Sequence, residues 1–430
     1  MTIEFKAKIA DLFNLVVAKG ASFLLTVIVF SVIARGLGRG QFVNFGFWWS
    51  NAIMVGGVLF GGLASGLIRI LSVRGTLVHL GPVAIRSSVL FGCGLLVLAA
   101  GGLLWPAFRP FILLLGAVAV FGAIFQIQTC VLTLLRARMA TRANAIASGV
   151  IVLVGPLLVL LLLGGSRNLT WVFLVLSLAF AIATGLALVL SREVFAGMVR
   201  PNPEVPRPDP LFLPSVVSFT AVNVFSYVSL GIDFNLFKWL RPAAEFEIMG
   251  GGKIFFERFT LPALLVVAGA FSITVLRHNA VAATEGQGVP KVPFRPKPLQ
   301  VLGLGLICLA SSAGYHVFER FIRHEVNLLP LAATLCLSAA YVVYALNAIL
   351  FDVLAIRRGF RRVVIHVLGF LLLGLVGQFL AIRTFGLWGW VGCWLLYNLT
   401  IFGILLYENV ELQSGKALDG LEAPRAKGEC

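Results

Sequence analysis

Twelve apolar stretches, each long enough to cross a lipid bilayer as a helix, constrain this chain more than any other feature of its sequence. They cover residues 12–34, 43–67, 87–105, 111–134, 144–164, 169–190, 212–238, 256–276, 298–318, 328–350, 362–382 and 386–407. Inside a bilayer the backbone must satisfy its own polar groups, and a helix does so within one segment. The sequence therefore predicts an all-α polytopic membrane protein of about twelve transmembrane helices.

The composition agrees with this prediction and excludes several classes of protein. Hydrophobic residues make up 59% of the 430 residues and charged residues only 12%, against about 45–50% and about 25% in soluble domains. Lys and Arg number 34 and Asp and Glu 18, which gives a net charge of +16. In so apolar a chain this excess favours contact with anionic membrane lipids. Nucleic-acid binding is not expected, because no basic stretch combines exposure with aromatic residues for stacking.

The distribution of basic residues predicts the orientation in the membrane. With a cytoplasmic N-terminus, the segments on the cytoplasmic side carry twice as many Lys and Arg residues as those on the other side. This bias follows the positive-inside rule, so we expect both termini in the cytoplasm. The first apolar stretch contains Lys19 and continues directly into the next spans, which favours a retained helix over a cleaved signal peptide.

A proline-rich segment divides the chain into two halves. Residues 191–211 contain five prolines between positions 201 and 210, so we expect a stiff, extended cytoplasmic linker. It separates a bundle of six spans at 1–190 from a second bundle of six at 212–407, and residues 408–430 form a cytoplasmic tail. The turns that follow the first and seventh spans, 37–46 and 240–250, resemble each other weakly. A parallel repeat about an axis along the membrane normal, with a cavity between the halves, is therefore predicted.

Four stretches of the sequence carry a resemblance to a known family. They are the opening pair of spans with Ala34–Gly38 and the glycine-rich run 56–69, the end of the fourth span at Leu134–Arg138, the seventh span and its turn from Asn223 to Gly250, and Phe385–Gly392. In these stretches the chain resembles the oligosaccharide-lipid flippases (Wzx-type polysaccharide transporters) of the multidrug/oligosaccharidyl-lipid/polysaccharide exporter superfamily. One departure is Val43, which stands where many members have glycine.

The resemblance implies a fold, a location and a function. The fold is a V-shaped, MATE-like pair of six-helix bundles in the bacterial inner membrane. The function is transfer of a polyprenyl-diphosphate-linked oligosaccharide from the cytoplasmic to the periplasmic leaflet, for the biosynthesis of cell-surface polysaccharide. The implied partners are the lipid-linked oligosaccharide, membrane lipids, and polysaccharide polymerase and co-polymerase proteins.

Ionisable residues inside the spans are the first candidates for function, because hydrocarbon tolerates them poorly. Asp233 lies deep in an apolar stretch with no basic residue within one turn. We expect it to be protonated, paired across helices or bound to a cation. Its functional interpretation is proton or sodium coupling, and its structural interpretation is an ion pair with Lys19 or Arg69. Lys19 itself either binds a diphosphate or extends to the cytoplasmic surface.

Arginine and amide side chains complete the set of candidates for the substrate cavity. Arg69 and Arg258 stand at the ends of spans, where a guanidinium either binds phosphate through paired donors or anchors the helix at the interface. Asn51, Gln126 and Asn223 either contact sugar hydroxyls or hydrogen-bond neighbouring helices. The glycines spaced four apart at 57–66 favour close helix packing.

Motifs for enzymatic chemistry are missing from the sequence. The run Gly250–Ile254 is not a phosphate-binding loop, because Glu247 takes the place of the first glycine and Ile254 that of the Ser or Thr. The five histidines and six cysteines show no metal-ligand spacing. We therefore expect no cofactor, no metal and no catalytic residue, and a protein that is not an enzyme.

Three alternatives to the flippase remain open. An ion-coupled exporter of small amphipathic molecules on the same scaffold would have a smaller, less cationic cavity and an essential Asp233. A membrane-embedded polysaccharide polymerase or ligase would need a long outer loop with histidine, and the longest outer loop predicted here, 239–255, has none. A lipid II-type flippase of the same superfamily would usually have fourteen spans.

Overall fold

The computed structural model describes residues 27–37, 39–57, 80–138, 140–163, 168–199, 231–261, 263–264, 298–355 and 360–414, and within these ranges the chain is almost wholly helical. The labelled helices are α2 (Arg39–Gly56), α4 (Leu80–Leu104), α5 (Arg109–Ala137), α6 (Thr141–Leu163), α7 (Leu169–Leu190), α8 (Arg192–Val199), α10 (Ala243–Phe255), α12 (Pro298–Val317), α13 (Leu331–Ala355) and α14 (Phe360–Ser414). Two further helical segments cover 27–37 and 231–240. Short turns of 3-10 or π helix are η2 (Pro106–Phe108), η3 (Phe256–Thr260) and η4 (Phe318–Ile322).

Six helices in this part of the chain are long and apolar enough to cross a membrane. They are Arg109–Leu135, Arg142–Leu163, Leu169–Leu190, Leu302–Ile322, Leu331–Phe351 and Ile365–Val410. The last belongs to α14, which covers two predicted spans and bends at Gly386. The predicted fold class, an all-α membrane protein built from two helical bundles, is confirmed.

Local sequence explains where several helices begin or bend. The side chain of Asn168 accepts a hydrogen bond of 2.9 Å from the backbone amide of Thr170 and so caps α7. Pro242 stands immediately before α10, where its missing amide costs no helical hydrogen bond. Gly386 has φ 56° and ψ −126°, a conformation that favours glycine, and there α14 folds back on itself.

The predicted outer loop 239–255 is the largest difference from the sequence analysis, and that prediction was wrong. The helix 231–240 and α10 are separated only by Arg241 and Pro242, and α10 continues without a break into η3. Lys253 and Glu257 lie inside the helix bundle. Of these two, only Lys253 belongs to the segment predicted as a loop, and in the fold its charge is opposed by Asp233 and Glu257.

Two smaller boundaries also differ from prediction. The extended linker predicted at 191–211 begins with the helix α8, whose Met198 is fully buried. The tail predicted from residue 408 begins inside α14, which ends only at Ser414 and buries Glu408 and Asn409. At the first place a separate short helix follows the turn at Ser191, after α7 has ended at Leu190 as predicted. At the second, α14 continues past residue 407, where the hydropathy falls, so average hydropathy marks the end of that helix too early.

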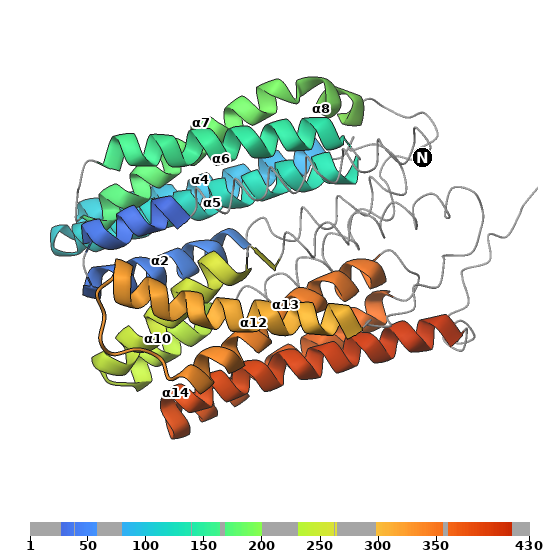
Figure 1. Ribbon diagram of the computed structural model, residues 1–430. Coiled ribbons are helices and arrows are strands. Elements are labelled where there is room, and N and C mark those ends of the chain that lie inside the picture. The colour runs from blue at the N-terminus through green and yellow to red at the C-terminus, as the bar shows by residue number, and fades with distance from the viewer. Residues whose placement is uncertain are drawn as a thin grey trace, which may run out of the picture.

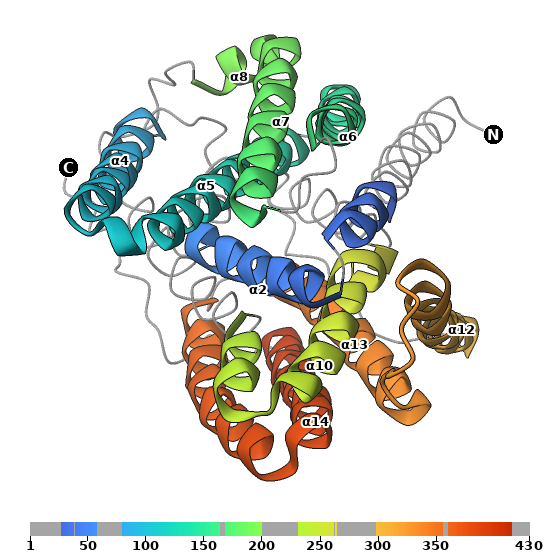
Figure 2. The same cartoon turned by 90° about the vertical axis from the view of Figure 1, so that its left-hand side faces the viewer.

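The helices form two groups with α2 between them (Figure 1). Helices α4 to α8 pack together with 27–37 and α2, and we call this group the N-lobe. Helices α10 to α14 with 231–240 form the C-lobe. The turns at Trp105, Arg241 and Gly386 mark one end of the bundle, which we call the Gly386 end. Viewed from this end, α2 crosses between the lobes and lies beside α10 (Figure 2).

Glycines let α2 approach both of its neighbours closely. On the N-lobe side, a Cβ on Gly122 of α5 would collide with the backbone carbonyl of Ala52, and the ring centroids of Trp49 and Phe121 lie 4.5 Å apart. On the C-lobe side, a Cβ on Gly46 would overlap Ile254, and one on Gly250 would overlap Val43. Gly46 and Gly250 belong to the two turns that resemble each other in sequence, so each turn supplies the glycine at which it meets the opposite half.

A paired substitution in α5 tests the role of this close packing. Gly122→Ala should destabilise the protein by about 1–3 kcal/mol, because the new methyl group meets backbone that cannot rotate away. Gly116→Ala in the same helix has open space around it and should be neutral or stabilise by up to about 1 kcal/mol. Thermal unfolding in detergent measures both, and equal melting temperatures for the two variants would contradict the packing argument.

Candidate functional site

A lysine buried between two carboxylates lies near the interface of the two lobes. The side chain of Lys253, in α10, is only 1% exposed. Its Nζ lies 2.8 Å from Oδ1 of Asp233, in the helix 231–240, and 2.7 Å from Oε1 of Glu257, in η3. Lys253 and Glu257 are four residues apart and therefore share one face of the helix, which points them at the same partner.

Asp233 has further hydrogen-bond donors besides Lys253. The indole Nε1 of Trp390, in the second arm of α14, donates to Oδ2 of Asp233 at 2.9 Å. The backbone amide of Phe234 donates to Oδ1, also at 2.9 Å. Both carboxylate oxygens of Asp233 therefore have hydrogen-bond donors from the protein itself. Asp233 is therefore paired across helices, and its partner is Lys253 of its own half.

Glu257 connects this cluster to the N-lobe. Its Oε2 accepts a hydrogen bond of 3.4 Å from the hydroxyl of Ser50 in α2 and lies 3.7 Å from Nη2 of Arg258. The guanidinium of Arg258 lies over the ring of Trp49, also in α2, at 4.6 Å from its centroid. The side chain of Arg258 is 16% exposed, whereas that of Glu257 is 7% exposed.

We call Asp233, Lys253, Glu257 and Arg258 the charge quartet. With both carboxylates ionised and both cations protonated its formal charge is zero, which limits the cost of removing four charges from water. Nothing in it resembles a nucleophile with an adjacent base, the arrangement that covalent catalysis requires. The quartet offers instead cationic donors at the junction of two lobes, a chemistry suited to binding an anion or to responding to relative movement of the lobes.

The amide candidates fall in two different places. Asn51 accepts a hydrogen bond of 3.3 Å from Nδ2 of Asn235 and donates one of 2.9 Å to the carbonyl of Phe47. It therefore joins α2 to the helix 231–240 close to the quartet. Gln126, in α5, is 1% exposed and packs against Gly56, and its Nε2 has no hydrogen-bond partner among the described residues. The structure does not bring Gln126 together with the quartet.

Lys19, Arg69 and Asn223 lie outside the described residues, as does most of the glycine run 57–66. Their roles in the cavity stay predictions. Of the proposed partners of Asp233, neither Lys19 nor Arg69 is required to balance its charge, since Lys253 already lies 2.8 Å away.

Sequence reasoning missed Lys253, Glu257 and Trp390 as neighbours of Asp233. A signal was present: Phe-Glu-Arg-Phe occurs twice, at 256–259 and at 318–321. Both copies form a π-helical turn, η3 and η4, with a buried glutamate. The copies also touch, because the rings of Phe259 and Phe318 lie 4.9 Å apart. A glutamate that recurs in the same four-residue motif inside apolar sequence indicates that its charge is buried and paired with a cation.

The second copy carries its own ion-pair cluster at the Gly386 end. Arg323 donates from Nη1 to both carboxylate oxygens of Glu319, at 2.9 and 2.7 Å, and its Nη2 lies 3.3 Å from Oε1 of Glu325. Its side chain is 5% exposed. A Cβ on Gly251 of α10 would stand 2.6 Å from Nη1 of Arg323, so the glycine makes room for this guanidinium.

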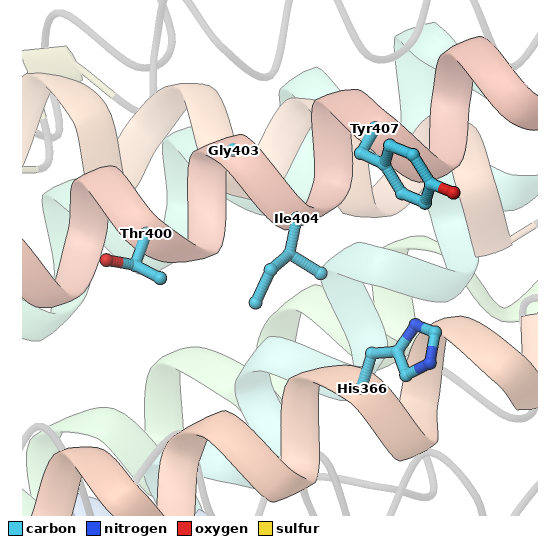
Figure 3. Close-up of a pocket in the computed structure, with 5 residues that line it drawn as sticks. All are labelled: His366, Thr400, Gly403, Ile404 and Tyr407. Carbon is cyan, nitrogen blue, oxygen red and sulfur yellow. The ribbon is translucent and has the colours of Figure 1, made fainter.

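A separate groove of about 580 Å³ lies between the two arms of α14 (Figure 3). It is lined by His366, Thr400, Gly403, Ile404 and Tyr407 and is mostly apolar. His366 Nδ1 lies 2.6 Å from Oε1 of Glu408, which joins the two arms near their ends. None of the quartet residues lines this groove.

Removing the buried ammonium group should destabilise the protein strongly. Lys253→Met leaves Asp233 and Glu257 without their shared partner, at a cost of about 3–5 kcal/mol. The double variant Asp233→Asn with Lys253→Met removes one charge of each sign and should recover part of that loss. Arg241→Gln breaks a partly exposed pair with Glu245 and serves as the control, with little expected effect. Thermal unfolding in detergent provides the measurement, and a double variant as unstable as the sum of the singles would contradict the pairing.

No protein-family model matches the sequence, and the search of curated proteins found no match. Solved structures do match. An outward-facing multidrug resistance MATE family transporter of the MOP superfamily aligns over 95% of this chain and 96% of its own, at 14% identity and a TM-score of 0.62. A mutant of the Vibrio cholerae MATE transporter VcmN aligns over 96% and 99%, at 14% identity and 0.58. A MATE protein in the straight conformation aligns over 95% and 97%, at 16% identity and 0.57.

Identity this low establishes the fold and nothing finer, but the alignment covers nearly the whole of both chains. The chain has the fold of the MATE transporters of the MOP superfamily.

Proposed function

We propose that this protein transports a polyprenyl-diphosphate-linked oligosaccharide across the bacterial inner membrane, from the cytoplasmic to the periplasmic leaflet. The fold supports a transporter, and the chemistry of the lobe interface supports an anionic substrate. The observation that carries the proposal is Arg258, a mostly buried guanidinium in contact with both lobes. With this function, both termini are cytoplasmic and the polymerase and co-polymerase of the same surface polysaccharide are the partners.

The guanidinium of Arg258 has donors available for a ligand. Its distance to Glu257, 3.7 Å, is an ion-pair distance and too long for a hydrogen bond. Its other contact within the described part of the chain is with the face of Trp49, which uses no N–H group. Guanidinium groups bind phosphate oxygens through two parallel N–H donors, and a diphosphate offers several such oxygens. Arg258 therefore suits the headgroup of a lipid diphosphate.

The carboxylates of the quartet favour the same substrate class. Asp233 and Glu257 both lie within 3 Å of Lys253, so neither is an unopposed negative charge waiting for a cationic substrate. The amides of Asn51 and Asn235 in the same interface provide groups of the kind that bind sugar hydroxyls. Within this formally neutral quartet, Arg258 supplies the N–H donors that favour an anionic ligand.

Sidedness of the lipid-linked glycan in inner-membrane vesicles tests the proposal. Glycan should stay on the cytoplasmic face in cells that lack the gene. Arg258→Gln should slow transfer about tenfold to a hundredfold, as expected for loss of a charge-assisted hydrogen bond. Arg258→Lys should retain part of the rate, because it keeps the charge and loses the paired donors. Arg241→Gln, at a partly exposed arginine paired with Glu245, is the matched control and should transfer normally.

Normal sidedness in cells without the gene, and without a second flippase, would rule out this substrate.

The variant Asp233→Asn, in the same assay, tests whether Asp233 takes part in ion coupling. If Asp233 takes part in ion coupling, this variant should fold and yet trap the glycan. If it only balances Lys253, the variant should lose stability and transfer in proportion.

The second candidate function is ion-coupled export of a small amphipathic molecule. It is favoured by the likeness to a structure described as a multidrug resistance MATE family transporter. In this case the buried Asp233–Lys253 pair would be the coupling site. Loss of the gene should then raise sensitivity to amphipathic drugs and leave glycan sidedness unchanged, the opposite of the result expected for the flippase.

A further inference from the structure

Three cations of the C-lobe lie over three aromatic rings of one N-lobe helix, α2. Nζ of Lys238 is 4.0 Å from the centroid of Phe47, at the end of the helix 231–240. The guanidinium of Arg258 is 4.6 Å from the ring of Trp49, and that of Arg323 is 5.0 Å from the ring of Phe42. All three distances fall within the range of favourable cation–π contacts.

The aromatic residues of α2 point to two different sides. Phe45 is fully buried and packs against N-lobe rings, with centroid distances of 5.4 Å to Phe173 and 5.7 Å to Phe30. Its contacts remain when the lobes move apart. Those of Phe47 do not, because Lys238, Phe234 and Phe246 all belong to the C-lobe.

Two of the three cations are held in place by carboxylates of their own lobe. Glu319 binds Arg323 through both oxygens, and Glu257 pairs with Arg258. The rings they meet are buried, with Phe42 0% and Trp49 4% exposed. A cation already oriented by a carboxylate loses little freedom on meeting a ring, and a desolvated contact is stronger than one in water.

We propose that Lys238, Arg258 and Arg323, together with Phe42, Phe47 and Trp49, form a latch that holds the lobes together. The proposal rests on the proposed function only in that a transporter must open and close its lobes. Each contact has one member in each lobe, so it contributes to the closed state and is lost in the open one. Removing a contact therefore shifts the population toward the open state.

The glycine contacts explain why the latch is reversible. Gly46 against Ile254 and Gly250 against Val43 are apolar contacts that fit the lobes together closely. Hydrogen bonds from Ser50 to Glu257 and from Asn235 to Asn51 cross the same interface. The cations add a directional attraction that depends on ring position. Lobe separation therefore exposes cationic groups and aromatic faces together.

The distance between two spin labels at the Gly386 end tests the latch. Trp105→Cys labels the N-lobe and Val326→Cys labels the C-lobe, since both side chains are exposed. The protein is full-length, in lipid nanodiscs, with its six native cysteines replaced by alanine or serine. Double electron–electron resonance then gives the populations with short and long inter-label distances, which report the closed and open states.

Single and double variants isolate one contact. Phe47→Leu and Lys238→Met should each raise the ratio of open to closed protein about threefold to tenfold, the range expected for one such contact. The double variant should shift no further than either single, because both changes remove the same interaction. Lys238 is exposed, so its substitution leaves the core intact and tests the latch even if Phe47→Leu fails to fold.

Phe45→Leu is the matched control: it truncates a buried ring of α2 whose ring contacts among the described residues all lie within the N-lobe. It should leave the distance distribution unchanged, and combined with Lys238→Met it should give the distribution of Lys238→Met alone. Unchanged distributions in Phe47→Leu and Lys238→Met, or effects that simply add, would overturn the latch. Loss of the flippase assignment in the sidedness assay with the label shifts intact would overturn the substrate and leave the latch standing.

Discussion

The ammonium group of Lys253, enclosed by Asp233 and Glu257, determines how the centre of this molecule is arranged. It lies on α10 inside the bundle and forms ion pairs with the helix 231–240, through Asp233, and with η3, through Glu257. Through Glu257 and its neighbour Arg258 the arrangement reaches Ser50 and Trp49 of the other lobe. Arg258, which contacts the N-lobe, is therefore already paired with a carboxylate of the C-lobe. This pairing fixes its position at the interface.

The sequence alone predicted the class of fold, because the length of an apolar stretch determines whether it can cross a bilayer as a helix. The helix α7, for example, begins and ends where its apolar stretch does. It failed where charge is buried in pairs. The residues around Lys253 were assigned to a loop because hydropathy counts each charge separately and cannot register a partner that arrives from another helix. Asp233 was identified because it is an isolated charge in an apolar stretch, which the sequence shows directly. Its partners Lys253 and Trp390 are distant in sequence and come near it only in the folded protein.

Small residues and aromatic residues have different roles at the lobe interface. Glycines set how closely α2 approaches α5 and α10. The aromatic rings of α2 meet neutral rings of the N-lobe on one side, and both cations and neutral rings of the C-lobe on the other. Val43 illustrates the balance: it fills the space that Gly250 leaves on the opposite helix. A large residue on one helix and glycine on the other is a pairing that neither stretch of sequence reveals alone.

The reversal at Gly386 takes place without a loop, since α14 is helical on both sides of a single left-handed residue. Its arms meet again near their far ends, where His366 contacts Glu408. These two connections, the turn and the His366–Glu408 contact, favour movement of the two arms as one unit over sliding of one arm along the other. We therefore expect a displacement of Trp390, near the turn, to reach the opposite end of the bundle through both arms.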